Sequence, residues 1–286
     1  MTTFPSDPDT LITLDEIGLA SASVGDHVLR TAFDLCFKIA GDRLVIAAVS
    51  PQLQVFRDGR QIRTQIFLRE IGDGDRRLVH RLEVPLHLRN LLHLGIEDVD
   101  HVIDLSRLSL DDDLPASEIG ALVNRVLADT ELDPRRIVAR IDIGNETQVE
   151  RARGVLLALQ SLGAHTAVGG SIDGYPPVGA IRALRPDLAV LDSRWLARVT
   201  AKPEAVPLLQ SLIERMQDRG ATVMVEGIET AGHAAAAFAA SADWVSGAVL
   251  SKPSLAGTLV EPPVYRLSDL LRAGGRPVPL VGGIRS

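Results

Sequence analysis

The chain has 286 residues, of which 46% are hydrophobic and only 3% aromatic, and its formal net charge is −7. This length and composition allow a large aliphatic core within a single domain of about 250 residues. The negative charge, without any basic stretch interleaved with aromatic residues, argues against a nucleic-acid-binding surface. The single cysteine, Cys36, excludes a disulfide framework and a cysteine-based zinc site, and we expect it to be buried as a small apolar residue.

The N-terminus is polar and contains proline, without the cationic segment and apolar core of a signal peptide. No apolar run approaches the roughly 18 residues that a bilayer-spanning helix needs. We therefore expect a soluble, cytoplasmic protein. Its predicted organisation is an N-terminal extension (1–25), a barrel domain (26–258) and a C-terminal extension (259–286) whose Gly/Pro-rich end is expected to be mobile.

The first third of the chain gives mixed signals. Apolar residues at helical spacing predict a helix over 26–39, and a continuous apolar run predicts a strand over 44–49. Residues 55–68 are typical of two extended pieces around a hairpin turn. A further turn is expected over 72–75, followed by a short helix over 85–94 with proline in its first turn.

From residue 101 onward, strands and helices alternate. The expected strands are 101–105, 136–143, 165–168, 188–191, 222–225 and 243–250. The expected helices are 115–128, 146–162, 176–184, 203–219, 231–240 and 267–271. Strands that alternate with helices indicate a parallel sheet, and about eight strands in one chain predict a closed TIM-like (β/α)8 barrel. An open doubly wound sheet is the alternative.

The stretch 221–230 combines a buried strand with two carboxylates, Glu226 and Glu229. Gly227 frees the backbone where the strand ends, and Thr230 suits the N-cap of the Ala-rich helix that follows. In parallel α/β proteins, functional groups gather where strands end and helices begin. The alternative is that both acids are solvated or cap the next helix.

Several segments resemble motifs of the EAL domain family of bacterial cyclic di-GMP phosphodiesterases and receptors, and they occur along the chain in the family's order. The strongest are EGIET at 226–230, similar to the family's EGVET, and SGAVLSKP at 246–253, similar to its QGYLFSKP. Weaker matches are 65–69 to EALLR, 104–106 to NLS, 174–175 to GYSSL and 188–192 to ILKID. The resemblance covers roughly residues 40–255, and it implies an EAL-type barrel.

Hydrolysis in this family uses two divalent metals held by carboxylates, with a lysine at the reacting centre. The resemblance places other residues at most of these positions: Gln65, Asp104, Arg140 or Ala139, Gly169 with Gly170, Val190, and Ser246. Glycine offers no side-chain oxygen in place of two adjacent aspartates. We therefore expect no catalytic residue, no metal site and no cofactor. Weak binding of one Mg²⁺ by Glu226, Asp104 and Asp142 stays open as an alternative.

The resemblance also names candidate residues for a cyclic di-GMP cleft. They are Arg69, Asp192, Glu226, Glu229, Ser246, Lys252 and Pro253. Arg69 would contact phosphate through its guanidinium. The alternative for Arg69 is an ion pair with Asp104 or Glu226, and for the two glutamates it is hydrogen bonding to backbone N–H groups.

Three functions follow from this pattern. The favoured expectation is a catalytically inactive EAL-like regulator of cyclic di-GMP-related signalling that binds a signalling protein. The alternative is a metal-independent cyclic di-GMP receptor, and an active phosphodiesterase is the least favoured. A homodimer is implied by the resemblance alone, with the helix 231–240 and Trp244 as a dimer face or, alternatively, as a buried flank.

Overall fold

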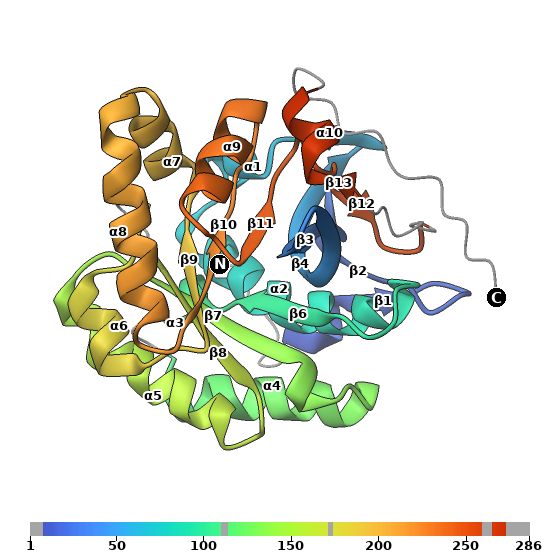
Figure 1. Ribbon diagram of the computed structural model, residues 1–286. Helices are drawn as coiled ribbons and strands as arrows, with labels where there is room; N and C mark the ends of the chain where they lie inside the picture. The colour runs from blue at the N-terminus through green and yellow to red at the C-terminus, as the bar shows by residue number, and fades with distance from the viewer. Residues whose placement is uncertain (1–7, 110–113, 171–173, 259–264, 273–286) are drawn as a thin grey trace.

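The computed structural model describes residues 8–109, 114–170, 174–258 and 265–272. Eight strands form a closed barrel in the order β3–β11–β10–β9–β8–β7–β6–β4, and β4 pairs with β3 to close it (Figure 1). Their bounds are β3 (His27–Ala40), β4 (Arg43–Arg57), β6 (Asp100–Asp104), β7 (Ile137–Ile143), β8 (His165–Gly170), β9 (Leu188–Leu191), β10 (Thr222–Val225) and β11 (Trp244–Ser246). Only β3 runs antiparallel to its neighbours. The expected closed barrel is confirmed.

The barrel interior is filled by side chains that alternate along the strands. They are Cys36, Ala48, Val102, Val138, Ala167, Leu188, Val190 and Met224, and Trp244 packs against them. The expected burial of Cys36 is confirmed. Because side chains two apart point to the same face of a strand, the next inward positions on β6, β7 and β10 are Asp104, Arg140 and Glu226. These polar residues therefore lie at the mouth of the barrel, above an apolar floor.

Helices cover the outside of the parallel strands, and the largest apolar core lies between the two layers (Figure 1). They are α3 (Ser106–Ser109), α4 (Ala116–Thr130), α5 (Val149–Gln160), α6 (Val178–Leu184), α7 (Ser193–Thr200), α8 (Val206–Gln217), α9 (Ala231–Ala239) and α10 (Leu267–Arg272). Three-residue 3-10 turns at 134–136, 146–148 and 203–205 precede β7, α5 and α8. No helix in the described ranges is both long and apolar enough to span a membrane.

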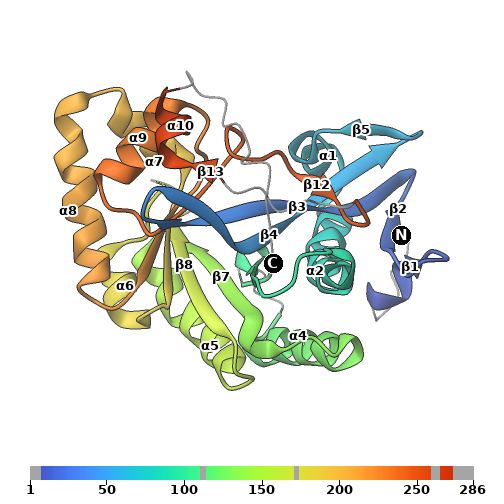
Figure 2. The same cartoon turned by 45° about the vertical axis from the view of Figure 1, so that its right-hand side comes forward.

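A smaller lobe adjoins the barrel on one side (Figure 2). It consists of β1 (Ile12–Leu14), β2 (Ala20–Val24), β5 (Arg60–Ile62), α1 (Thr64–Glu70) and α2 (Asp73–Asn90), with 3-10 turns at 8–11 and 91–93. The lobe has its own apolar core, in which Phe67 and Leu82 are fully buried. The long strands β3 and β4 belong to both units, since β2 pairs with the start of β3 and β11 with its end.

The helix expected over 26–39 is wrong, because these residues form β3. Apolar side chains are buried on both faces of this strand, so its alternation is masked and the spacing imitates a helix. The turn expected at 72–75 is also wrong, whereas residues 85–93 are helical as expected but do not begin a helix. Both segments fall largely within the single helix α2, with Pro85 in its interior.

The later elements agree better with expectation. The strand at 188–191 is reproduced, whereas the one expected over 243–250 is shorter and only Trp244–Ser246 pairs in the barrel. Residues 254–255 instead form β12 against β3, and β13 (Tyr265–Arg266) pairs with β4. Helix α7 was not expected from the sequence. The tails at 1–7 and 273–286 lie outside the described residues.

Adjacent leucines of α5 test the packing of the helical layer. Leu156 is 3% exposed and Leu157 is 57% exposed. We expect Leu156→Ala to lower the free energy of unfolding by about 2–5 kcal/mol, because it leaves a cavity in the core. Leu157→Ala, the matched control, should change it by less than about 0.5 kcal/mol. Urea unfolding of both variants checks this, and equal losses would contradict the assigned helix orientation.

Candidate functional site at the barrel mouth

Arg140 is the centre of the barrel mouth and joins two carboxylates. Its Nη1 and Nη2 donate to the Glu226 carboxylate at 2.7 and 2.9 Å. Its Nε and Nη2 donate to Asp142 at 2.8 and 3.2 Å. Both contacts are bidentate, which is the geometry in which a guanidinium binds carboxylates most strongly. Four of the five N–H groups of Arg140 are used in this way.

This ion-paired triad is largely shielded from water. The side chain of Arg140 is 10% exposed, and those of Asp142 and Glu226 are 19% and 26% exposed. Burial opposes the charge on Arg140, but Glu226 and Asp142 outweigh it and hold the guanidinium pKa well above its usual range. Burial also raises the pKa of Asp142 above its ordinary value, against the lowering effect of Arg140.

Asp104, at the end of β6, belongs to the same mouth but is held differently. Its Oδ1 accepts from the Ser106 N–H at 2.8 Å and also from the Ser106 hydroxyl. The Ser106 Oγ in turn accepts from the Asp142 N–H at 2.8 Å. Asp104 therefore fixes the start of α3 and ties β6 to β7.

The end of β8 has no room for the acids that the family carries there. A Cβ added at Gly169 would overlap Asp142 Oδ1 and lie 3.1 Å from Asp142 Cγ. One added at Gly170 would overlap the Tyr175 carbonyl and lie 2.5 Å from the Tyr175 N. Asp142 and the backbone of Tyr175 thus fill the space that two aspartate side chains would need.

Two cavities open on the barrel mouth, with Glu226 and Gln52 in the wall of both. We call the larger one, of about 370 Å³, the α2-side cavity. Its lining includes Glu83, His87, Asp104, Arg107, Arg140 and Glu226. The other, of about 300 Å³, is the β11-side cavity. Its lining includes Asp34, Gln52, Glu226, Glu229, Ser246 and Pro253.

One acid in each cavity, half-buried Asp34 and buried Glu83, has a raised pKa. Burial raises the pKa of Asp34 to about 6, and the nearby Glu226 raises it further while the Gln52 amide, which donates to Asp34, lowers it. Burial raises the pKa of Glu83 to about 7 despite its ion pair with Arg107. The sequence did not single out Asp34 or Glu83, since neither lies in a motif.

The predicted cleft residues separate into two groups. Glu226, Glu229, Ser246 and Pro253 line the β11-side cavity. Asp192 is 8% exposed, and its Oδ1 accepts from the Trp195 N–H at 3.3 Å, at the start of α7. Lys252 and Arg69 are exposed, and neither is in the wall of these two cavities.

Two expectations about individual contacts are corrected, and one open choice is resolved. The guanidinium that pairs with Glu226 belongs to Arg140, not to Arg69. Glu226 therefore binds a side chain across the barrel, where hydrogen bonds to backbone N–H groups had been the alternative. Of the two residues considered for the acid position on β7, Arg140 faces the mouth, whereas Ala139 packs in the outer core.

The second extended piece expected within 55–68 is confirmed only for β5, because α1 begins at Thr64. Gln65 lies on helix α1. The strand that closes the barrel beside β6 is β4, and the residues it brings to the mouth are Ser50 and Gln52. Gln65 of α1 and the middle of β4 both border the α2-side cavity.

The residues at the mouth do not fit the pair of divalent metals that the EAL resemblance implies. Metal ions of this kind need carboxylates that are free to offset their charge. Here Glu226 and Asp142 already bind a guanidinium, and Gly169 supplies no oxygen. Across the described parts of the chain, no group of three or more His, Cys, Asp or Glu side chains is arranged to hold a metal ion.

Comparison with known proteins identifies the family. The model of the EAL domain matches residues 57–253, which is more than half of the chain, so this protein belongs to the EAL domain family. A search of curated proteins found no match.

Solved structures confirm the fold at low sequence identity. The Bacillus subtilis YkuI protein, solved with c-di-GMP and calcium, is similar with a TM-score of 0.65 at 20% identity, over 82% of this chain and 57% of that one. A standalone EAL protein from Vibrio cholerae O395, solved with c-di-GMP bound, has a TM-score of 0.66 at 14% identity. The match covers 81% of this chain and 94% of that one. The FimX EAL domain from Pseudomonas aeruginosa has a TM-score of 0.64 at 19% identity, and the match covers 79% of this chain and 90% of that one. This chain thus spans little more than half of YkuI but nearly all of the other two.

Removing the guanidinium tests the triad. We expect Arg140→Met to lower the free energy of unfolding by about 3–5 kcal/mol at pH 8, because two adjacent buried carboxylates lose their counter-charge. Their pKa values in the folded variant then rise above the unfolded values, so the loss should shrink as pH falls towards about 4 and both groups take up protons. Urea unfolding at several pH values measures it.

Arg135→Met is the matched control, because Arg135 also pairs with an aspartate two residues away but its side chain is 81% exposed. Its loss should be small at every pH. A loss for Arg140→Met that does not depend on pH would contradict the role assigned to the carboxylates.

The crowding at β8 gives a second test. We expect Gly169→Ala to cost about 1–3 kcal/mol of stability through overpacking against Asp142. In an Asp142→Ala background the cost of Gly169→Ala should largely disappear, whereas that of Gly170→Ala should persist because its obstacle is the backbone of Tyr175. A double-mutant cycle by urea unfolding measures both couplings. Additive effects of Gly169→Ala and Asp142→Ala would refute the assigned contact.

Proposed function

We propose that this protein is a non-catalytic EAL-domain regulator in bacterial cyclic di-GMP-related signalling, and that it acts by binding a signalling protein. The observation that carries the proposal is the bidentate pairing of Arg140 with both Glu226 and Asp142. Two-metal hydrolysis needs bound metal ions at this place, which polarise the phosphodiester and activate a water molecule. The guanidinium of Arg140 supplies positive charge here but cannot coordinate water or substrate as a metal ion does.

The surroundings of Arg140 support the same conclusion. Val190, at the place of the family's lysine, is fully buried in the barrel interior and has no group that could assist a reaction. Gly169 and Gly170 contribute no acid, and Asp142 occupies the adjacent space. Together these features favour an EAL barrel retained for its shape and surface. We further propose that the protein works in the cytoplasm and that a homodimer is compatible with its family.

A metal-independent cyclic di-GMP receptor is the second candidate. It is favoured by the two cavities that remain at the mouth, and by relatives such as the FimX EAL domain that were solved with c-di-GMP bound. It is disfavoured by charge, because phosphate groups at this place would face Glu226, Asp104 and Glu83. The two bases in the same wall, Arg107 and Arg140, are already paired with Glu83 and Glu226.

Hydrolysis and binding assays separate these functions. We expect no turnover of cyclic di-GMP with Mg²⁺ or Mn²⁺, and no heat on calorimetric titration of cyclic di-GMP with Mg²⁺ or with a chelator. Turnover would overturn the proposal. Micromolar binding that survives chelation would establish the receptor instead, and Arg69→Ala should then abolish it if Arg69 contacts phosphate.

A further inference from the structure

The α2-side cavity contains a buried histidine that the proposed function does not use. His87 lies on α2, is 6% exposed, and forms part of the cavity wall. Burial, with a smaller contribution from Arg107, lowers its pKa to about 3. The imidazole is therefore neutral at physiological pH, and only one of its two ring nitrogens carries a hydrogen.

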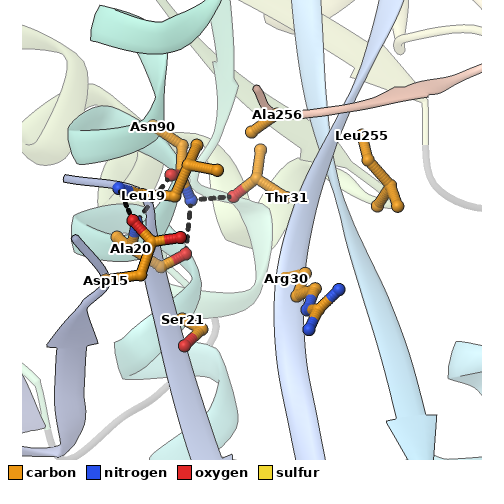
Figure 3. A pocket seen from close by; sticks show the side chains of 9 residues that line it. All are labelled: Asp15, Leu19, Ala20, Ser21, Arg30, Thr31, Asn90, Leu255 and Ala256. Atoms are coloured by element: carbon orange, nitrogen blue, oxygen red, sulfur yellow. Dashed lines mark hydrogen bonds between the residues drawn. The ribbon is translucent and has the colours of Figure 1, made fainter. Parts of the chain in front are cut away.

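A chain of hydrogen bonds determines which nitrogen that is. The backbone N–H of Ala20 donates to Asn90 Oδ1 at 2.9 Å, which fixes the orientation of the Asn90 amide. Asn90 Nδ2 then donates to the Ala20 carbonyl at 2.9 Å and to Thr31 Oγ1 at 3.0 Å (Figure 3). Both Asn90 and Thr31 are 1% exposed.

The last link runs from Thr31 to the histidine. Thr31 Oγ1 lies 2.9 Å from His87 Nδ1. Thr31 already accepts a hydrogen bond from Asn90, and its own buried O–H needs an acceptor, since an unpaired buried hydroxyl is costly. His87 Nδ1 is that acceptor. The ring hydrogen of His87 is therefore on Nε2. Among the described residues, no polar atom forms a hydrogen bond with Nε2.

One helical turn away, Glu83 provides the complementary group. Residues four apart lie on the same face of a helix, so His87 and Glu83 face the cavity side by side. Glu83 is 9% exposed and binds Arg107 through one oxygen, Oε1. The cavity wall thus presents a neutral N–H donor beside a carboxyl acceptor.

The charge and shape of the cavity narrow the ligand further. Arg107 and Arg140 are already paired with Glu83 and Glu226, and Asp104 is a further acid in the wall, so an anion is disfavoured. Its size of about 370 Å³ lies in the range of small-molecule sites. A carboxamide or lactam edge carries a carbonyl oxygen next to an N–H, which is the pattern complementary to His87 and Glu83.

We propose that the α2-side cavity binds an uncharged small molecule with a carboxamide or lactam edge, whose carbonyl accepts from His87 Nε2–H and whose N–H donates to Glu83. The proposal does not require hydrolysis of cyclic di-GMP, and its ligand would occupy one of the two cavities on which the receptor alternative rests. It assigns a ligand-binding role to α2, a helix of the smaller lobe.

Nicotinamide and nicotinate are suitable probes because they have the same ring. Nicotinamide carries a carboxamide at the position where nicotinate carries a carboxylate. Titrations followed by NMR should show saturable binding of nicotinamide and at least tenfold weaker binding of nicotinate. His87→Leu should weaken nicotinamide binding at least tenfold. His93→Leu, the control, replaces a histidine that binds the Gly18 carbonyl outside this cavity and should leave binding unchanged.

The tautomer is measured separately on the wild-type protein labelled with ¹⁵N-histidine, so it is decisive even if His87→Leu does not fold. We expect the His87 resonances to show hydrogen on Nε2, and Thr31→Val to remove this preference. Hydrogen on Nδ1 in the wild type, no saturable binding of nicotinamide, equal binding of nicotinate, or unchanged binding in a folded His87→Leu variant would each overturn the proposal.

Discussion

The pairing of one guanidinium with two carboxylates sets the character of the barrel mouth. Arg140 comes from β7 and Glu226 from the end of β10, so the contact crosses the barrel. An uncompensated charge in this shielded place would be costly, which means that each member of the triad fixes the others. The crowding beside Gly169 follows from the same contact, because Arg140 holds Asp142 in the space next to β8.

A second set of polar residues lies beside the triad and connects the smaller lobe to the barrel mouth. Glu83, His87 and Asn90 follow one another along α2. Asn90 satisfies backbone groups of β2, whereas Glu83 binds Arg107 of α3. Asn90 exchanges hydrogen bonds with the backbone of Ala20 and also donates to Thr31, which lies next to His87 Nδ1. Buried networks of this kind favour one arrangement of their side chains.

The sequence predicted the parallel part of the barrel well, because each strand there is short, apolar and followed by a helix with clear ends. It failed where both faces of a strand are buried, as in β3, and where Gly72, Gly74 and Pro85 suggested breaks in the single helix α2. Glu226 was identified from its position after a strand. Its partner was not, because residues 86 positions apart meet only once the barrel has closed. Asp34, Glu83 and His87 carried no recognisable local signal.

The hairpin of β3 and β4 has a mechanical consequence. Its strands are 14 and 15 residues long and extend from the core of the smaller lobe into the wall of the barrel, with one register shift between Cys36 and Phe37. Each helix of the outer layer is connected to the barrel strands by a loop. The two strands of this hairpin instead contribute side chains to the apolar cores of both the lobe and the barrel. Ser50 and Gln52 at the barrel mouth are therefore joined by paired backbone to the core of the smaller lobe, so a displacement of the lobe would act on the mouth through this hairpin.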